Sequence, residues 1–148
     1  MTGFYNRNAY DYFIYNEKNI KNYMVVTFDL NNLKMCNDNY GHSSGDAYII
    51  HSAHIIETTF DRFGKCYRIG GDEFCCLIPD AAEFQIERFI QKMQQDIAIL
   101  NNKNIIPTEV GIACGYALAT PDDADIEKVR ERADEMMYHN KKVLKGLI

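Results

Sequence analysis

The sequence predicts an α/β fold in which helices flank a mixed central sheet. Two observations predict it: strand-like apolar runs alternate with segments of helical periodicity, and a pair of glycines joins two of those runs as a hairpin. The expected order of elements is α-β-α-β-β-α-β-α. With 148 residues and no repeat, low-complexity run or linker, the chain suits one domain, residues 1–148.

The first two elements are expected to be a helix and a buried strand. Asn6 or Asn8 is placed to cap a helix that runs to about Lys18, since apolar residues recur on one face at helical spacing. The β-branched and aromatic run 23–28 has the composition of a strand buried in the middle of a sheet. It leads into Asp29, so this carboxylate is expected to project just past the strand.

The middle of the chain is expected to hold helical segments and the hairpin. Residues 33–40 predict a short helix or an irregular turn, and a longer helix is expected over about 45–60. Ser43 or Ser44 is placed to cap that longer helix. Residues 66–78 follow as the hairpin, with the two glycines between its strands.

Two helices and one strand are expected in the last part of the chain. Residues 82–100 place apolar side chains at a 3.6-residue period, which predicts a strongly amphipathic helix. An extended region is expected to begin at 105–106, and the run 110–117 predicts a buried strand. The final helix is expected over 125–144, where early acids and late lysines complement the helix dipole.

The composition narrows the classes of function. Hydrophobic residues make up 47% and charged residues 25% of the chain, as in ordinary globular proteins. A net charge of −5 argues against broad binding to nucleic acid or anionic membranes, although a local basic cluster could still bind one nucleotide. No apolar run approaches the roughly 18 residues of a membrane span. We expect a cytoplasmic domain excised from a longer protein, which could itself be anchored in a membrane.

The cysteines predict no special chemistry. They are five, an odd number, and none forms a C-x-x-C pair. We expect small buried side chains in a reducing compartment, in preference to disulfide partners or zinc ligands. The five are Cys36, Cys66, Cys75, Cys76 and Cys114.

The hairpin tip carries Gly70, Gly71, Asp72 and Glu73 between its two apolar strands. Glycine enters positive φ without steric cost, so the pair is expected to form a tight turn. Backbone without Cβ would also let a bulky anionic ligand approach closely. Adjacent acids at a turn are usually only solvated turn residues, and for the tip taken alone that interpretation is sufficient.

Asp29 gives the acids of the tip a second interpretation. A hairpin that pairs beside the buried strand would bring Asp72 and Glu73 close to Asp29, and three converging carboxylates repel one another unless a cation lies among them. A set of oxygen ligands that includes no histidine or thiolate suits Mg²⁺. Such a Mg²⁺ site is typical of enzymes that transfer phosphoryl or nucleotidyl groups. Each residue alone could instead fill or cap a turn, but the set favours a metal site.

Further segments are similar, in order, to the motifs of one family. They are Gly70–Phe74, Thr2–Arg7, Asp29–Lys34, Asn37–Asp38, Gly41–His42 with Gly45–Asp46, and Ala133–Asp134 with Tyr138 and Lys141. Together they resemble the GGDEF domains, the diguanylate cyclases, over essentially the whole chain. The resemblance implies a nucleotidyl cyclase-like, palm-like fold with a signature β-hairpin.

The resemblance implies a reaction and a metal site. In the family, two GTP molecules condense to cyclic di-GMP and release two pyrophosphates, the 3′-hydroxyl of each attacking the α-phosphate of the other. Carried over to this chain, Asp29, the Leu30 carbonyl, Asp72 and Glu73 would hold Mg²⁺, or Mn²⁺ in its place. Asp72 would accept the proton, Glu73 would act beside it as ligand or base, and Lys34 would complete the catalytic set.

The resemblance also implies a site for the nucleotide. Asp46 would accept hydrogen bonds from guanine N1–H and the 2-amino group, and Asn37 would bind N3 and the 2-amino group, which adenine does not match. Gly70 and Gly71 would line the substrate site. Without the resemblance, lysines in the last turn of a helix would more often be interpreted as solvent-exposed residues that complement the helix dipole. The lysines that would contact the triphosphate are Lys34, Lys141 and Lys145.

Several departures from the family pattern bear on function. Asn31 stands where a second aspartate is frequent, and Leu33 where phenylalanine is usual; both leave Asp29 in place. Lys145 stands where the family has an arginine. Lysine lacks the bidentate contact that arginine makes with phosphate, so KM for GTP could rise. The inhibitory product-binding motif Arg-x-x-Asp is missing, since residues 61–64 read Asp-Arg-Phe-Gly, and we expect no feedback inhibition through it.

The leading hypothesis is a bacterial, Mg²⁺-dependent diguanylate cyclase domain. It would work as a homodimer because each copy brings one GTP, and an upstream sensor domain would pair the copies. The alternative is a catalytically weak or inactive GGDEF domain that serves as a GTP-binding regulatory or interaction module. Asp46 disfavours a cyclase that makes cyclic AMP-type or mixed products. Neither nucleic acid nor a membrane is expected as a partner of this domain.

Overall fold

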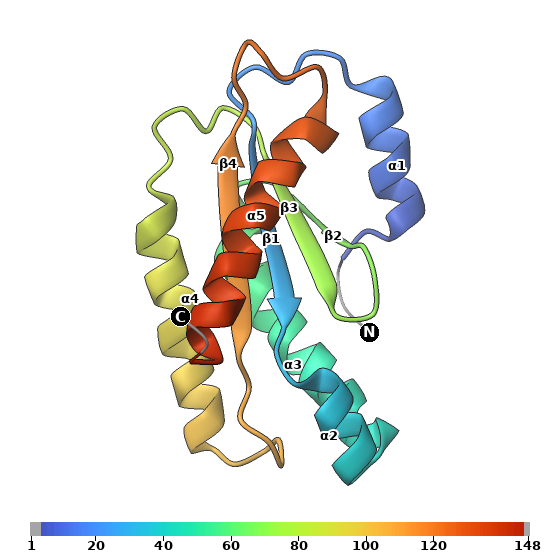
Figure 1. Cartoon of the computed structure of the whole chain (residues 1–148), viewed down its shortest axis with the longest axis vertical. Coiled ribbons are helices and arrows are strands. Elements are labelled where there is room, and N and C mark those ends of the chain that lie inside the picture. The colour runs from blue at the N-terminus through green and yellow to red at the C-terminus, as the bar shows by residue number, and fades with distance from the viewer. Residues whose placement is uncertain (1–3, 147–148) are drawn as a thin grey trace.

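The computed structural model describes residues 4–146, so Thr2 and Gly3 of the first motif lie outside it (Figure 1). Within these residues no helix is long and apolar enough to cross a membrane. The observed order has one helix more than the expected one, because residues 33–40, expected as a short helix or an irregular turn, form a regular helix. In chain order the elements are α1 (Arg7–Asn16), β1 (Met24–Leu30), α2 (Leu33–Tyr40), α3 (His42–Phe60), β2 (Lys65–Arg68), β3 (Glu73–Ile78), α4 (Ile86–Asn102), β4 (Ile112–Leu118) and α5 (Ile126–Leu144).

Side-chain caps begin two of the helices where the sequence predicts them. At the start of α1, Asn6 Oδ1 accepts a hydrogen bond from the Ala9 amide at 2.9 Å. At the start of α5, Asp125 Oδ1 accepts from the Lys128 amide at 3.2 Å. Each cap satisfies an amide that the helix itself leaves without a partner, so neighbouring residues favour the start of these helices.

The four strands form one sheet in the order β2-β3-β1-β4, and neighbouring strands run antiparallel. The α/β class is confirmed, and among residues 4–146 the parallel pairing expected of a mixed sheet is limited to an isolated bridge between Tyr5 and Tyr67. The central strand β1 is buried along its whole length, as its apolar run predicts. The register places Asp29 opposite Glu73 on β3 and opposite Ala113 on β4.

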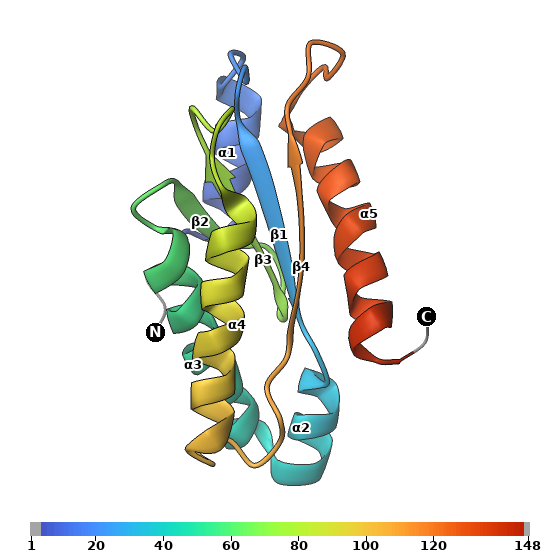
Figure 2. The ribbon, with the colours of Figure 1, turned by 90° about the vertical axis from the view of Figure 1, so that its left-hand side faces the viewer.

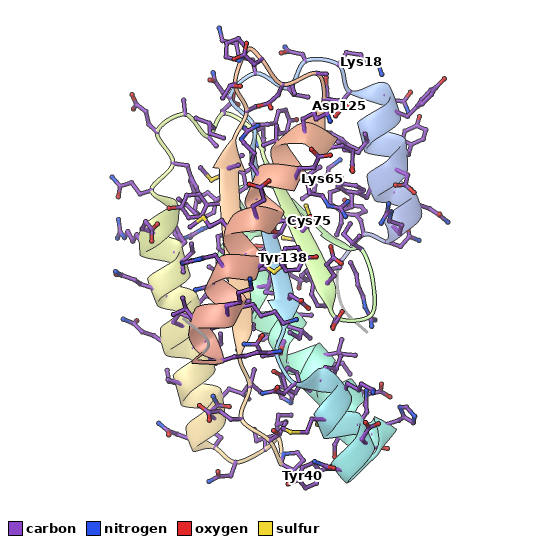
Figure 3. All side chains as sticks on the ribbon, in the orientation of Figure 1. Lys18, Tyr40, Lys65, Cys75, Asp125 and Tyr138 are labelled. Atoms are coloured by element: carbon purple, nitrogen blue, oxygen red, sulfur yellow. The ribbon has the colours of Figure 1, made fainter. Side chains whose placement is uncertain are left out.

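Helices cover both faces of this sheet (Figure 2). On one face, α3 and α4 pack over the larger of two apolar clusters, to which Phe28 of β1 belongs. The smaller cluster lies on the other face and includes Val25 of β1, Ala133 of α5 and Cys75, which is labelled in Figure 3. Because side chains alternate along a strand, Asp29 leaves β1 on the same face as Val25, toward α5.

The third helix begins earlier than the sequence predicts, at His42. Gly41 ends α2 and begins α3, and its φ of +91° lets the chain turn between the two helices without a linker. Ser43 and Ser44 therefore lie in the first turn of α3. The prediction that one of them caps this helix was wrong, because the glycine turn already provides the helix start.

The fourth helix begins later than predicted, at Ile86. Phe84 stays outside the helix and packs its ring against Phe63, with centroids 4.9 Å apart, and against Phe89 at 5.1 Å. Its amide turns back to the Ala81 carbonyl at 3.1 Å. The packing of three aromatic rings, which comes from separate parts of the chain, thus decides where this helix starts.

The segment between α4 and β4 is irregular, and the extended structure expected to begin at 105–106 is not found there. Asn101 of α4 bonds both backbone groups of Val110: its Nδ2 donates to the carbonyl at 3.0 Å and its Oδ1 accepts from the amide at 2.8 Å. The Asn101 side chain thus satisfies both backbone groups of Val110 in place of a strand partner, and β4 begins only at Ile112.

The five cysteines are free and buried, so they contribute apolar packing as the sequence predicts. Cys66 of β2 and Cys76 of β3 are partners in the antiparallel register, and their sulfur atoms are 2.6 Å apart. Burial raises the pKa of the Cys75 thiol, which keeps it protonated. These side chains act as small hydrophobic residues of the sheet.

α5 approaches the sheet very closely at Gly115 in β4. A Cβ built on Gly115 would lie 2.1 Å from the Ala133 carbonyl oxygen and 2.3 Å from the Met137 amide nitrogen, both backbone atoms of α5. No side chain can be accommodated at those distances. The absence of a side chain at this position therefore allows the backbones of helix and strand to touch.

We predict that Gly115→Ala lowers the free energy of unfolding by about 3 kcal/mol, or prevents folding, because α5 must move off the sheet to admit the methyl group. Urea denaturation followed by circular dichroism measures the change. Gly71→Ala is the control, since a Cβ at Gly71 meets nothing within 4 Å. Equal stability of the two variants would contradict the close approach of α5.

Candidate active site

Two carboxylates leave the same face of the sheet from adjacent strands. Asp29 of β1 and Glu73 of β3 are partners in the antiparallel register, so their side chains lie next to each other. The hairpin tip is also joined to β1, because the Leu30 amide donates to the Asp72 carbonyl at 2.9 Å. The hairpin therefore pairs beside the buried strand, as the sequence predicts.

Asp29 is only 8% exposed and is held by a lysine of α5. The Lys141 Nζ donates to Asp29 Oδ2 at 2.7 Å. The other oxygen, Oδ1, is buried and accepts no hydrogen bond from any described residue. Burial raises the pKa of Asp29, the Lys141 ammonium opposes that rise, and the Asp72 carboxylate adds to it. Asp29 thus offers one buried, unpaired oxygen to a cation.

Glu73 is partly buried, and a second cation of α5 lies beside it. Arg130 Nη2 is 3.6 Å from Glu73 Oε1, and Arg130 Nε is 3.7 Å from Asp134 Oδ2. Burial raises the pKa of Glu73, and the Arg130 guanidinium opposes that rise. Between the sheet and α5 there are therefore more carboxylates than cations, which favours the binding of further positive charge.

The hairpin tip is a loop over residues 69–72, not the tight glycine turn that the sequence predicts. The Ile69 and Gly70 amides close it by donating to the Glu73 carbonyl at 2.9 and 3.2 Å. Neither Gly70 nor Gly71 has a positive φ. Arg68 at the base of the hairpin holds the loop, since its Nε and Nη2 donate to the Gly70 and Gly71 carbonyls at 3.2 and 2.8 Å. The two glycines instead leave the main chain bare, and a Cβ on Gly71 would meet nothing within 4 Å.

Asn37 of α2 packs against Gly45, the residue that precedes Asp46 on α3. The Asn37 side chain lies directly over the backbone of Gly45, because a Cβ built on Gly45 would be 1.6 Å from Asn37 Oδ1. Gly45 therefore makes room for the amide, and Asp46, the next residue, is exposed beside it. A neighbouring amide and carboxylate can bind the edge of a purine that carries N1–H and an amino group.

The three lysines predicted to contact phosphate are placed differently. Lys141 contacts Asp29, as the ion pair above shows. Lys34 is exposed on α2, and Lys145 is exposed at the C-cap of α5. The structure therefore brings Lys141 to the acids of the sheet and leaves Lys34 and Lys145 in solvent.

The donor atoms of this site suit a hard divalent cation. Asp29, the Leu30 carbonyl, Asp72 and Glu73 offer only oxygen, and the buried Asp29 Oδ1 lacks a partner. Within residues 4–146, no group of three or more histidine, cysteine, aspartate or glutamate side chains is already arranged to hold a metal ion. A cation that bound here would compete with Lys141 for Asp29.

Reasoning from the sequence assigned no role to Arg130 and treated Asp134 only as part of a motif. Both lie on α5, one turn apart, and the guanidinium also faces Glu73 of the sheet. The spacing of Arg130, Asp134 and Lys141 could have indicated a polar strip beside the apolar strip of this helix. The sequence does not show which strand that strip would face.

A buried tyrosine of α3 anchors the backbone just past Asp29. The Tyr48 hydroxyl donates to the Asn31 carbonyl and accepts from the Gly111 amide at 3.0 Å. Burial raises the pKa of Tyr48 to about 12, so the hydroxyl keeps its proton near neutral pH. The phenol thus ties the chain after β1 to the chain before β4, next to the candidate ligands.

Comparison with known proteins gives a match over almost the whole chain. The family model described as diguanylate cyclase, GGDEF domain, matches residues 1–145. Diguanylate cyclase DgcN of Escherichia coli is 30% identical over 147 residues, which cover 95% of this chain and 36% of that protein. Diguanylate cyclase DgcS of Shewanella oneidensis is 27% identical, over 95% of this chain and 48% of its own length. The chain spans about a third to a half of the length of these relatives.

The same fold is found among solved structures. The GGDEF domain of DgcB from Caulobacter crescentus, crystallised in complex with c-di-GMP, has a TM-score of 0.81 to this chain. Its sequence is 23% identical, and the match covers 95% of this chain and 87% of that one. At this identity the likeness shows the fold, and it confirms the predicted fold class.

We predict that Tyr48→Phe lowers the free energy of unfolding by about 1 to 3 kcal/mol, because the Asn31 carbonyl and the Gly111 amide lose a buried partner. Urea denaturation measures the loss. Tyr138→Phe, which removes the hydroxyl of an exposed tyrosine on α5 (Figure 3), is the control and should change stability by less than about 0.5 kcal/mol. Losses of similar size in both variants would count against the anchoring role.

Proposed function

The chain belongs to the GGDEF domain family, and on that premise we propose that it is a diguanylate cyclase domain. In this proposal two GTP molecules condense to cyclic di-GMP and release two pyrophosphates. The observation that supports it most is the register of β1 and β3, which pairs Asp29 with Glu73 of the signature. Two segments far apart in the chain thereby meet as one acidic site beside the glycine loop of the hairpin.

The proposed ligands of a divalent cation, Mg²⁺ or Mn²⁺, are Asp29, the Leu30 carbonyl, Asp72 and Glu73. When bound, such a cation neutralises phosphate charge and lowers the pKa of the attacking 3′-hydroxyl. Asp29 contributes its buried, unpaired Oδ1. Lys141, which holds the other oxygen of Asp29 in this structure, is released toward the triphosphate of the substrate.

The reaction requires a proton acceptor and positive charge near the phosphates. In each half-reaction the 3′-oxygen of one GTP bonds to the α-phosphorus of the other, and the bond from that phosphorus to pyrophosphate breaks. Asp72 accepts the proton of the 3′-hydroxyl with Glu73 beside it, and the two carboxylates titrate as a pair. Lys34, Lys141 and Lys145 stabilise the charge of the triphosphate and the leaving pyrophosphate.

Asn37 and Asp46 select guanine in this proposal. The Asp46 carboxylate accepts from N1–H and the 2-amino group, and the Asn37 amide binds N3 and the 2-amino group. The packing of Asn37 against Gly45, the residue before Asp46, supports this assignment. Gly70 and Gly71 let the substrate approach the bare main chain of the hairpin.

The product needs two GTP molecules, and each copy of the domain offers one guanine-binding pair. The active form in this proposal is therefore a homodimer in which two hairpins face each other. An upstream sensor domain of a longer protein would bring the copies together, in keeping with the share of its relatives that this chain spans. We place the domain in the bacterial cytoplasm, and the net charge of −5 disfavours nucleic acid or anionic membranes as its partners.

A second candidate function is a GTP-binding regulatory or interaction module with weak or no catalysis. Lys145 favours it, because lysine stands where an arginine would hold phosphate through two donors. Asn31 favours it as well, because an amide next to the proposed ligands carries no charge for a cation. Both candidates share the proposed guanine-binding residues and differ in whether product forms.

We predict that the concentrated or artificially dimerised protein converts GTP to cyclic di-GMP with Mg²⁺ and stops when a chelator removes the metal. Asp72→Ala and Glu73→Ala should each lower product formation at least about 100-fold, since each removes a carboxylate at the reacting centre. Chromatography of the nucleotides measures the product, and thermal unfolding shows that the variants are folded. GTP binding without any product would reject the cyclase and support the second candidate.

We predict that Asp46→Ala lowers kcat/KM for GTP by about 100-fold or more, because guanine N1–H and the amino group lose their acceptor. Steady-state kinetics on GTP measure the effect. Asp61→Ala removes the same charge at the other end of α3 and should leave kcat/KM within about twofold of the wild-type value. Equal losses in the two variants would indicate a general effect of charge in place of base recognition.

A further inference from the structure

Arg130 of α5 lies among three carboxylates, and its side chain is only 14% exposed. The guanidinium presents a different nitrogen to each acid, and a lysine in its place could not do so, because its ammonium is a single point charge. Its Nη2 is 3.6 Å from Glu73 Oε1, its Nη1 is 3.4 Å from Glu127 Oε1, and its Nε is 3.7 Å from Asp134 Oδ2.

A tyrosine of α1 contacts the same group. Tyr10 is fully buried, and its ring centroid is 5.3 Å from the Arg130 Cζ. Its hydroxyl donates to Glu127 Oε1 at 2.6 Å. Attraction between a cation and an aromatic face is stronger where water is excluded. The contacts from α1 to the signature hairpin are therefore continuous, through Tyr10, Glu127, Arg130 and Glu73.

Because these side chains are partly buried, the loss of one charged group would leave another charge in the cluster without a partner. Burial opposes the positive charge of Arg130, but contacts with Tyr10 and Glu127 outweigh it and raise the pKa of the guanidinium. A partly buried carboxylate that loses its cation is left with an uncompensated charge, and it moves toward water or another cation. Without Arg130, the Glu73 side chain would therefore be free to leave its place beside Asp29.

We propose that Arg130 is a positioning residue for Glu73, and that Tyr10 and Glu127 connect it to α1. The inference rests on the proposed function, since it concerns a carboxylate of the proposed reaction. The guanine-binding residues lie on α2 and α3, away from these contacts, so the cluster acts on turnover and not on substrate affinity. A displacement of α1 would shift Glu73 through the same contacts, which makes this helix a route for regulation of the site.

The test compares Arg130→Gln and Arg130→Lys with the control Lys128→Gln in the whole chain. Lys128 lies on the same helix, exposed beside Glu131, and its replacement removes the same charge without touching Glu73. Cyclic di-GMP formation over a range of GTP concentrations gives kcat and KM separately. We expect kcat to fall about tenfold in Arg130→Gln with KM within about twofold, to fall less in Arg130→Lys, and to stay unchanged in Lys128→Gln.

Tyr10→Phe tests the connection to α1 without a change of charge. It removes the hydroxyl bonded to Glu127 and keeps the ring, which contacts Arg130 and also Tyr67 of β2. We expect kcat about threefold lower with KM unchanged. An unchanged kcat in this variant overturns the connection to α1. An unchanged kcat in Arg130→Gln, or a fall matched by a rise in KM, overturns the positioning role.

A double-mutant cycle on stability separates this inference from the proposed function. Glu73→Gln, Arg130→Gln and the double variant are unfolded in urea, a measurement that needs no catalysis. We expect coupling, with the unfolding constant of the double variant at least about threefold away from the product of the single effects. Independent effects overturn the inference even if the protein is active. Coupling in a protein that makes no cyclic di-GMP rejects only the proposed function, and the placement of Glu73 by Arg130 stands.

Discussion

The pairing of β1 with β3 is the constraint on which the rest of the structure depends. In this register Asp29 lies opposite Glu73, and a slip by one residue would place the two acids on opposite faces of the sheet, because side chains alternate along each strand. Phe28 and Phe74, opposite each other one position along, belong to the larger apolar cluster under α3 and α4. Burial of these rings therefore determines where the acids point, and the candidate site consists of the side chains that this packing leaves on the opposite face.

Electrostatic balance on that face comes from one helix. Burial raises the pKa of both Asp29 and Glu73, and α5 supplies the opposing cations, Lys141 for the first acid and Arg130 for the second. Both cations reach the acids because Gly115 lets α5 lie directly on the sheet. In the proposed reaction they act differently: Lys141 exchanges its carboxylate for phosphate, whereas Arg130, enclosed by several partners, keeps its place.

Glycine serves three separate purposes around the proposed nucleotide site. Gly41 turns the chain between α2 and α3 through its positive φ, which places two helices in contact without a linker. Gly45 makes room for the Asn37 amide, where any side chain would overlap it. Gly70 and Gly71 need no unusual φ and instead leave a stretch of main chain uncovered. The reaction is proposed from family membership, and these local geometries are the reasons why nucleotide and acids could meet here.

The sequence by itself determined the features whose causes are local. Asn6 caps the first helix through its own neighbours, the apolar run of β1 marks the central strand, and the spacing of motifs identified the family and the acids of the candidate site. Tertiary structure alone decided where α4 begins, since Phe84 leaves the helix to meet a distant ring. It also decided that Lys141 holds Asp29 and that Arg130 faces the hairpin. These outcomes depend on contacts between segments far apart in the chain. The energies of such contacts cannot be inferred from any short stretch of the sequence.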